Sequence, residues 1–251
     1  EGTFSAPHND MEVIPYKEPN SVQKDALEIL NSDRELGINK GLIVMATGLG
    51  KTILAALDVA SYKPNRLLFV AHREEILKQS LKSFRMFMPS KSYGMYQGNT
   101  KDTESDFIFA SIQTLGKKSQ LEKFDRKHFD YIVIDEFHHV GARSYKSLVE
   151  YFEPSFLLGL TATPNRTDNI DILQFCGNNL LYKQDLIDGI KLNLLSSFDY
   201  RGIVDKHVDY TKITWKGKKF DEEDLTNNLN TLKRAQYIFE NWSNLKQTRT
   251  L

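Results

Sequence analysis

The chain has 251 residues and a formal net charge of +0, with 40% hydrophobic and 26% charged residues. This composition indicates a folded globular protein of one large domain or two small ones. It excludes an overall electrostatic attraction to nucleic acid, so any such contact requires a local basic patch. Cys176 is the single cysteine, which excludes an internal disulfide and favours a reducing, cytoplasmic location, and no apolar run is long enough to span a membrane.

The N-terminal part of the chain predicts a loose segment followed by a helix. Residues 1–19 are polar and contain prolines, which predicts an irregular lead-in. Asn20 then begins a helix, and Gln23 stands three positions later, which is the spacing of a capping box. In a capping box each side chain accepts a hydrogen bond from the other residue's backbone N–H, and this is the structural role that we expect for Gln23.

A glycine-containing turn follows the first apolar run, residues 42–44, and leads into a helix-forming segment. Residues 45–52 read M-A-T-G-L-G-K-T, with Met45 where the general P-loop pattern has its first glycine. Backbone N–H groups and the positive helix end suit a phosphate, Lys51 adds a charge, and the Thr52 hydroxyl suits Mg²⁺. The predicted phosphate-binding residues are Gly48, Leu49, Gly50, Lys51 and Thr52. The alternative is an ordinary glycine turn before a helix.

Four further apolar runs, at 67–71, 107–110, 131–134 and 156–160, alternate with helical patterns. This alternation predicts an α/β fold with a mainly parallel central sheet flanked by helices. A cluster of polar residues follows each run. Because ligands of such sheets bind at the carboxyl ends of the strands, we expect these clusters to meet at one edge.

The tail of the chain has a different pattern. Residues 208–220 predict a hairpin that turns at Gly217. A final helix is expected to follow, with one face formed by Leu229, Leu232, Ala235, Phe239 and Trp242.

Two adjacent acids, Asp135 and Glu136, follow the fourth apolar run. Beside a P-loop, such a pair can divide the chemistry of nucleotide hydrolysis, with Asp135 holding Mg²⁺ and Glu136 polarising the attacking water. The alternative is that the two carboxylates only cap the next helix. The P-loop in the same predicted sheet favours the catalytic interpretation.

Together these segments resemble the first RecA-like domain of superfamily 2 helicases and translocases of the DExH type. Residues 45–52 resemble motif I, which often reads A-T-G-x-G-K-T in that family, residues 135–138 resemble motif II, and residues 161–163 resemble motif III. Residues 70–73 and 111–114 resemble motifs Ia and Ib. The sequence around motifs Ia and II is most similar to the branch that contains type I and type III restriction motor subunits and excision-repair helicases.

The resemblance implies a set of site residues. Glu136 would be the catalytic base, with Lys51 and Asp135 completing the catalytic group, and Gln23 would recognise adenine. Coupling of nucleotide state to movement would involve His138, Thr161 and Thr163, and the nucleic-acid backbone would meet Arg73, Gln113 and Thr114. The implied cofactors are ATP and Mg²⁺, with Mg²⁺ held by Thr52 and Asp135.

The resemblance also implies an organisation and an activity. Residues 20–176 would form the ATP-binding domain, and residues 177–251 a connector and the start of a second RecA-like domain of the same polypeptide. The expected function is that of an ATP-dependent DNA helicase or translocase, acting on duplex DNA more than on single strands. Without the arginine finger of the second domain, this chain alone would be nearly inactive. The alternatives are an RNA helicase and a nucleotide-dependent sensor or scaffold, although the intact Lys51, Asp135 and Glu136 disfavour the latter.

Overall fold

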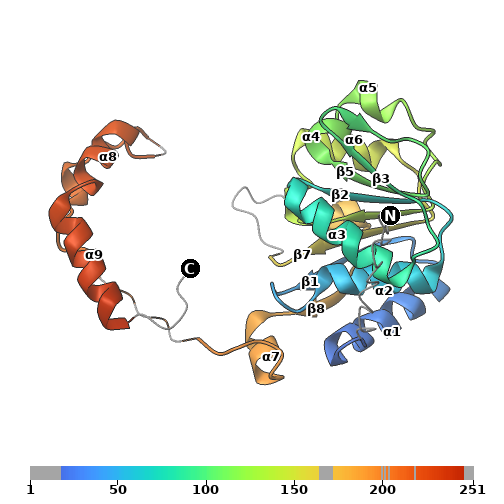
Figure 1. The fold of residues 1–251 in the computed structure, drawn as a ribbon, viewed down its shortest axis with the longest axis horizontal. Helices are drawn as coiled ribbons and strands as arrows, with labels where there is room; N and C mark the ends of the chain where they lie inside the picture. Colours follow the sequence, from blue (N-terminus) through green and yellow to red (C-terminus); the bar gives the residue numbers. More distant parts are fainter. Residues whose placement is uncertain are drawn as a thin grey trace, which may run out of the picture. The chain divides into compact units, whose positions relative to one another are not determined.

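An eight-stranded sheet forms the centre of the fold (Figure 1). The computed structural model describes residues 18–163, 172–198, 200, 202, 204–217 and 219–245. The strand order is β4-β3-β5-β2-β6-β7-β1-β8, and every pairing is parallel except that of β3 with β4. The strands are β1 (Lys40–Met45), β2 (Leu67–Ala71), β3 (Tyr93–Gln97), β4 (Thr100–Lys101), β5 (Phe107–Ser111), β6 (Tyr131–Ile134), β7 (Phe156–Thr161) and β8 (Leu180–Gln184).

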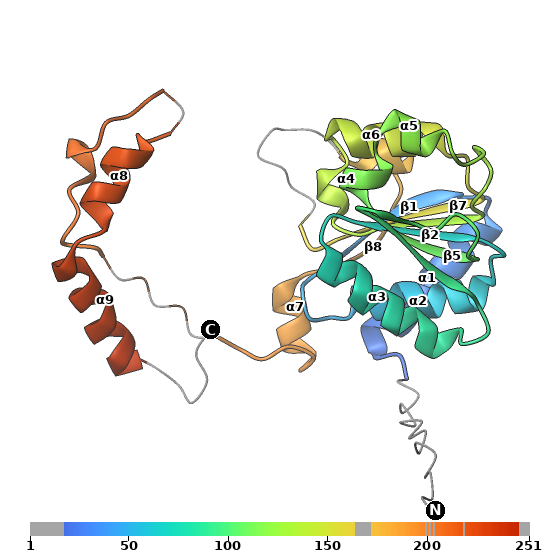
Figure 2. The same cartoon turned by 45° about the horizontal axis from the view of Figure 1, so that its top comes forward.

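Helices cover both faces of this sheet, which confirms the predicted α/β fold. The first face carries α1 (Ser21–Glu35), α2 (Lys51–Tyr62) and α3 (Glu74–Phe87). The second carries α4 (Ile112–Leu115), α5 (Lys118–Leu121), α6 (Arg143–Tyr151) and the 3-10 helix η1 (Phe137–His139) (Figures 1 and 2). Alternate strand residues enter opposite cores: Ile43 and Met45 join the first, whereas Leu42 and Val44 join the second. Burial on both faces explains why the central strands are apolar without interruption.

The five strands expected from apolar runs are β1, β2, β5, β6 and β7, whereas β3, β4 and β8 were not predicted. In β3 only alternate residues are fully buried, β4 has two residues, and β8 buries only Leu181. All three lie at or near the sheet margins, where strands need fewer apolar residues.

A buried ion pair ties the first-face helices to the sheet. The Arg34 guanidinium of α1 donates to both carboxylate oxygens of Asp58 in α2, at 2.9 and 2.6 Å. The hydroxyl of Tyr131, the first residue of β6, also donates to Asp58, which is 0% exposed. Burial raises the pKa of Tyr131, and the neighbouring Asp58 carboxylate raises it further. This group of Arg34, Asp58 and Tyr131 therefore satisfies a carboxylate that has no access to water.

The chain divides into two compact units, the first ending at Ser197 and the second beginning at Phe198. The first unit runs on past residue 176 because β8 pairs with β1. In the chain β8 is preceded by η2 (Ile172–Cys176) and followed by α7 (Leu186–Lys191). The assignment of 177–251 as a connector and domain start remains a prediction about function. The expected lead-in, 1–19, lies outside the described residues except for positions 18 and 19.

The second unit contains η3 (Tyr210–Lys212), α8 (Glu222–Leu229) and α9 (Leu232–Leu245). Among the described residues its only β-structure is a bridge between Trp215 and Phe220 around Gly217. No helix in the described parts of the chain is both long and apolar enough to cross a membrane.

Candidate functional site

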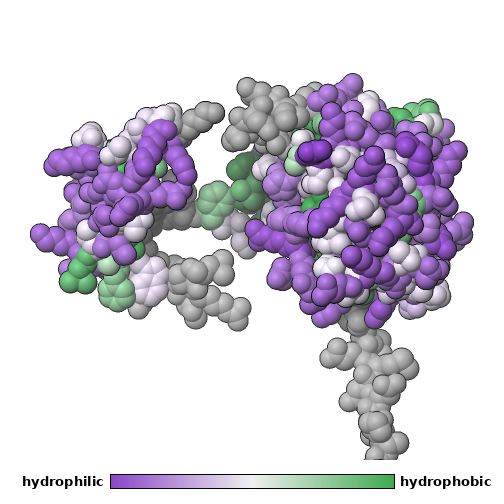
Figure 3. Space-filling view, turned by 90° about the horizontal axis from the view of Figure 1, so that it is seen from above, coloured by the Kyte–Doolittle hydropathy of each residue, from purple (hydrophilic) through white to green (hydrophobic). Residues whose placement is uncertain are grey.

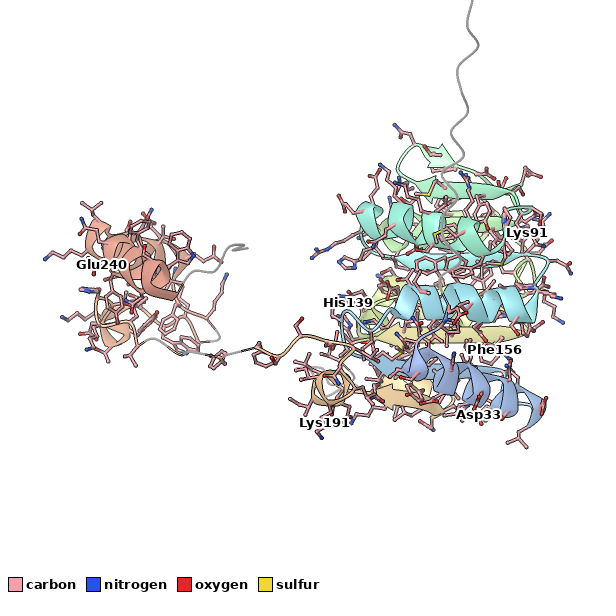
Figure 4. The ribbon with its side chains drawn as sticks, turned by 60° about the horizontal axis from the view of Figure 1, so that its bottom comes forward. Asp33, Lys91, His139, Phe156, Lys191 and Glu240 are labelled. Atoms are coloured by element: carbon pink, nitrogen blue, oxygen red, sulfur yellow. The ribbon has the colours of Figure 1, made fainter. Side chains whose placement is uncertain are left out.

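The polar clusters follow the carboxyl ends of β1, β2, β5, β6 and β7, which are neighbours in the sheet. In Figure 4 His139, just after β6, marks this edge, and Phe156, which begins β7, lies toward the opposite one. The parallel arrangement therefore gathers residues that are far apart in the sequence at one edge, as the alternation of strands and helices predicted.

The P-loop connects β1 to α2 through two glycines in the left-handed region. Gly48 has φ 91° and Gly50, the N-cap of α2, has φ 85°, conformations that other residues adopt only with strain. No side chain caps the first turn of α2 among the described residues, so its N–H groups face the loop. A Cβ on Gly48 would lie 2.8 Å from Leu195, so the chain after α7 lies against this loop. The loop thus has the form of an anion-binding turn, and a side chain at position 48 would collide with Leu195.

Lys51 and the two acids lie close enough to influence one another. The Lys51 ammonium donates to the Met45 carbonyl oxygen at 2.9 Å. Burial lowers the pKa of Lys51, and the Asp135 and Glu136 carboxylates oppose that effect. Burial raises the pKa of Asp135, whereas a hydrogen bond from the Glu136 backbone N–H at 2.9 Å and the Lys51 charge lower it. A buried carboxylate near a half-buried ammonium has the chemistry to bind a divalent cation beside phosphates.

Glu136 has a backbone conformation that is costly for a residue with a side chain, with φ 56° and ψ 43°. Its carboxylate oxygen Oε2 lies 3.2 Å from His138 Nε2, and His138 Nδ1 lies 3.1 Å from the Thr161 hydroxyl oxygen. The Thr161 hydroxyl in turn donates to the Thr163 carbonyl oxygen at 2.9 Å. Side chains that follow β6 are therefore joined to the last residue of β7, in one chain of contacts from Glu136 through His138 to Thr161.

Gln23 forms the expected capping box and also supports the P-loop. Its Oε1 accepts from the Asn20 N–H at 3.0 Å, and the Gln23 N–H donates to Asn20 Oδ1 at 2.9 Å. Its Nε2 donates to the Gly50 carbonyl oxygen at 3.0 Å and lies 3.4 Å from that of Leu49. The capping role is confirmed by this geometry. Both polar atoms of the Gln23 amide thus have protein partners. Recognition of adenine by Gln23 stays a prediction.

The three residues predicted to meet nucleic acid lie after β2 and β5, two adjacent strands. Gln113 Nε2 donates to the His72 carbonyl oxygen at 2.8 Å, and Arg73 Nε donates to His72 Nε2 at 3.1 Å. The Thr114 hydroxyl oxygen accepts from the Gly98 N–H at 3.0 Å. The structure brings Arg73, Gln113 and Thr114 together at the same edge as the P-loop.

The Gly98 contact reveals residues that the sequence analysis missed. Gln97, the last residue of β3, and the turn residues Gly98 and Asn99 line a surface pocket of about 370 Å³ together with His72 and Gln113. A Gly-Asn pair between two polar-alternating segments was the available signal for this hairpin, and Gly98 has φ 50°. The turn places polar groups beside Gln113 and Thr114.

Two sets of possible metal ligands occur at the edge. Thr52 and Asp135 offer oxygen atoms, which Mg²⁺ prefers. Glu136, His138 and His139 also have ligand atoms within 4.8 Å of one another, but two of the three are imidazoles, which suit transition metals rather than Mg²⁺. The donor chemistry therefore favours Thr52 and Asp135 for Mg²⁺.

The fold and the residues at its edge define a class: a RecA-like domain of the superfamily 2 helicase type. Solved structures share the fold, among them the Sulfolobus solfataricus SWI2/SNF2 ATPase core in complex with double-stranded DNA. The identity is 21% and the TM-score 0.51, with coverage of 64% of this chain and 36% of the other.

The family model for the type III restriction enzyme res subunit (ResIII) matches residues 16–166, which is more than half of the chain. The chain belongs to this family. It is 27% identical to the type I restriction enzyme EcoAI endonuclease subunit of Escherichia coli over 81% of this chain and 26% of that protein. It is 30% identical to the DNA 3'-5' translocase XPB2 of Sulfurisphaera tokodaii over 58% of this chain and 33% of that protein. The chain thus spans about a third or less of the length of these relatives.

Proposed function

We propose that this chain is the first motor domain of an ATP-dependent DNA helicase or translocase. The observation that carries the proposal is the meeting of Lys51 with Asp135 and Glu136 at one sheet edge, joined through His138 to Thr161. A phosphate-binding lysine beside a pair of acids is the arrangement needed for Mg²⁺-dependent hydrolysis of a nucleoside triphosphate. Membership of the ResIII family and the similarity to restriction and translocase proteins support DNA as the polymer.

In the proposed reaction Lys51 would contact the β- and γ-phosphates, and Thr52 and Asp135 would hold Mg²⁺. The metal ion would neutralise the charge that develops on the phosphate oxygens. Glu136 accepts a proton from the water that attacks the γ-phosphorus, as the bond from that phosphorus to the leaving ADP oxygen breaks. His138, between Glu136 and Thr161, would transmit the change at the γ-phosphate to the segment after β7.

The proposal includes a second RecA-like domain of the same polypeptide, because the chain spans about a third or less of the length of its relatives. An arginine supplied by such a domain accelerates phosphoryl transfer by about 10³–10⁵-fold. We therefore expect this chain alone to hydrolyse ATP slower than the full-length protein by about that factor. Equal turnover by the two proteins would contradict the need for a second domain. Stimulation by RNA but not by DNA would contradict the choice of polymer.

The role of Glu136 is tested by Glu136→Gln in the full-length protein. The amide cannot accept the proton, so steady-state hydrolysis should fall by about 10²–10⁴-fold, whereas nucleotide affinity measured by calorimetry should be retained. Glu28→Gln, an exposed position on α1, is the matched control and should leave both quantities unchanged. Wild-type hydrolysis by the Glu136 variant would remove this residue from the mechanism.

A further inference from the structure

A second pocket, lined by several cationic side chains, lies among α4, α5 and α6, on the face of the sheet opposite α2. Its volume is about 730 Å³, and four cationic residues line it against a single carboxylate, Glu150. The four cations are Lys117, Lys118, Arg126 and Arg143. The three helices lie side by side in Figures 1 and 2, and the first unit is predominantly hydrophilic when viewed from above in Figure 3. None of these residues belongs to the predicted nucleotide site.

Two of the four cations are available to a ligand. Arg126 donates to the Glu153 carboxylate at 2.8 Å, and Lys118 lies 3.8 Å from that of Glu122. Lys117 and Arg143 are exposed, and neither has a carboxylate partner among the residues that the structure describes. The charge of Glu150, the carboxylate of the lining, is met by Lys146 one turn away, at 3.7 Å. The pocket therefore presents uncompensated positive charge.

The pocket continues from the predicted nucleic-acid edge. Gln113 and Thr114 lie within α4, and Gly116 and Lys117 follow immediately after it. A Cβ on Gly116 would lie 2.7 Å from the Cβ of Ser144, so the absence of a side chain lets the end of α4 approach the first turn of α6. This approach brings Lys117 and Arg143 into the lining of one pocket. In the chain Lys117 stands only three positions after Thr114.

We propose that this pocket binds the sugar–phosphate backbone of the nucleic acid that crosses the edge at Arg73, Gln113 and Thr114. Lys117 and Arg143 contact the phosphates, and the hydroxyls of Ser144 and Ser147, which also line the pocket, donate to phosphate oxygens. Such contacts add affinity without reading bases, which suits a motor that must act on any sequence. This inference rests on the proposed function for its polymer, but it assigns a separate surface.

The test is the salt dependence of DNA binding by the chain, measured by fluorescence anisotropy on a labelled duplex. Each lost phosphate contact should reduce the slope of log K against log salt by about 0.9. Lys117→Gln and Arg143→Gln should each reduce the slope by about that amount, and the double variant by about twice as much. The matched control is Lys24→Gln, at an exposed position of α1 on the opposite face of the sheet, and it should keep the wild-type slope.

Arg73→Gln separates this inference from the proposed function. If Arg73→Gln lowers the slope while the double pocket variant keeps the wild-type value, the pocket is not a phosphate site and the proposed function stands. A loss of affinity in the double variant without a change of slope also overturns the pocket, because the lost contacts would then not be ionic. Absence of salt-dependent DNA binding by the unaltered chain overturns the proposed function and this site together. Thermal melting of each variant checks that it folds.

Discussion

Two buried aspartates stand near opposite ends of the same strand and have very different surroundings. Asp58, bonded to Tyr131 at the start of β6, is 0% exposed and receives two bonds from Arg34 and one from the Tyr131 hydroxyl. Asp135, directly after β6, is 8% exposed, and the bond to it within the described chain comes from a backbone N–H, that of Glu136. One carboxylate is satisfied by the fold, whereas the other is held where a ligand can meet it.

The difference shows how one strand can serve stability at one end and chemistry at the other. A buried charge costs free energy unless hydrogen bonds and an opposite charge offset that cost. Around Asp58 the protein supplies the offset itself. Around Asp135 the effect of burial is the largest and raises the pKa of the carboxyl group. The protein alone therefore does not offset the cost of this buried charge, and a bound cation would do so.

The largest expected effect is that of Asp135→Asn on hydrolysis. An amide is a poorer Mg²⁺ ligand than a carboxylate, and metal stabilisation of the transition state contributes several kcal/mol, so the rate should fall by about 10²–10⁴-fold. The free energy of unfolding should not decrease, because the substitution removes a buried charge. Steady-state ATPase assays and urea denaturation measure the two quantities. A loss of stability comparable with that of Asp58→Ala would abolish the proposed contrast.

Asp58→Ala should have the opposite profile. It leaves the largely buried Arg34 guanidinium without its carboxylate partner, and breaking a buried pair in this way costs about 3–5 kcal/mol of unfolding free energy. Removing both charges with Arg34→Met and Asp58→Ala should recover much of that loss. Asp25→Ala, at an exposed position of α1, is the control and should change stability by no more than about 0.5 kcal/mol. Equal stability of the Asp58 variant and the control would show that the pair contributes nothing.

The smallest effect concerns pH and the stability of the ligand-free chain. Because the pKa of Asp135 is raised above its ordinary value of 3.8, the folded state binds this proton more readily than the unfolded state does. The contribution of Asp135 to stability is therefore fully present below pH 3.8 and is lost as the pH rises through the raised value. Denaturation from acid to neutral pH measures the unfolding free energy of the wild type relative to that of Asp135→Asn. The wild type should lose stability relative to the variant as the pH rises. A difference independent of pH would contradict a raised pKa.

Much of the fold and the edge that carries the candidate site could be predicted from the sequence, because central parallel strands must be apolar on both faces. The P-loop turn and the acids after β6 are also local signals, each read within a few residues. The partners of Asp58 could not be predicted, since Arg34 and Tyr131 come from two other elements and only tertiary packing joins them. The basic pocket was missed for the same reason.

The tail was harder to predict. A hairpin was expected between residues 208 and 220, but the β-structure among the described residues there is limited to the bridge between Trp215 and Phe220, and Tyr210–Lys212 form η3. The hairpin prediction was therefore too long. The final helix was expected and is present as α9, whose Leu232, Phe239 and Trp242 remain exposed. The spacing of apolar residues along the sequence predicts that α9 is a helix, but it does not show which surface these residues pack against.

The position of β1 in the sheet has a consequence for the order of folding. This strand carries the P-loop, yet its two neighbours are β7 and β8, so Lys40 pairs with Leu157 and Leu42 with Leu180. The first residue after it, Ala46, donates its N–H to the Gln184 carbonyl oxygen at 3.0 Å. Closing such long loops is slow, and these contacts cannot form on the ribosome until the last strand has emerged. On a growing chain β1 can therefore pair with its two neighbours only after β7 and β8 have been synthesised, and the contact of Ala46 with Gln184 beside the P-loop has to wait for β8.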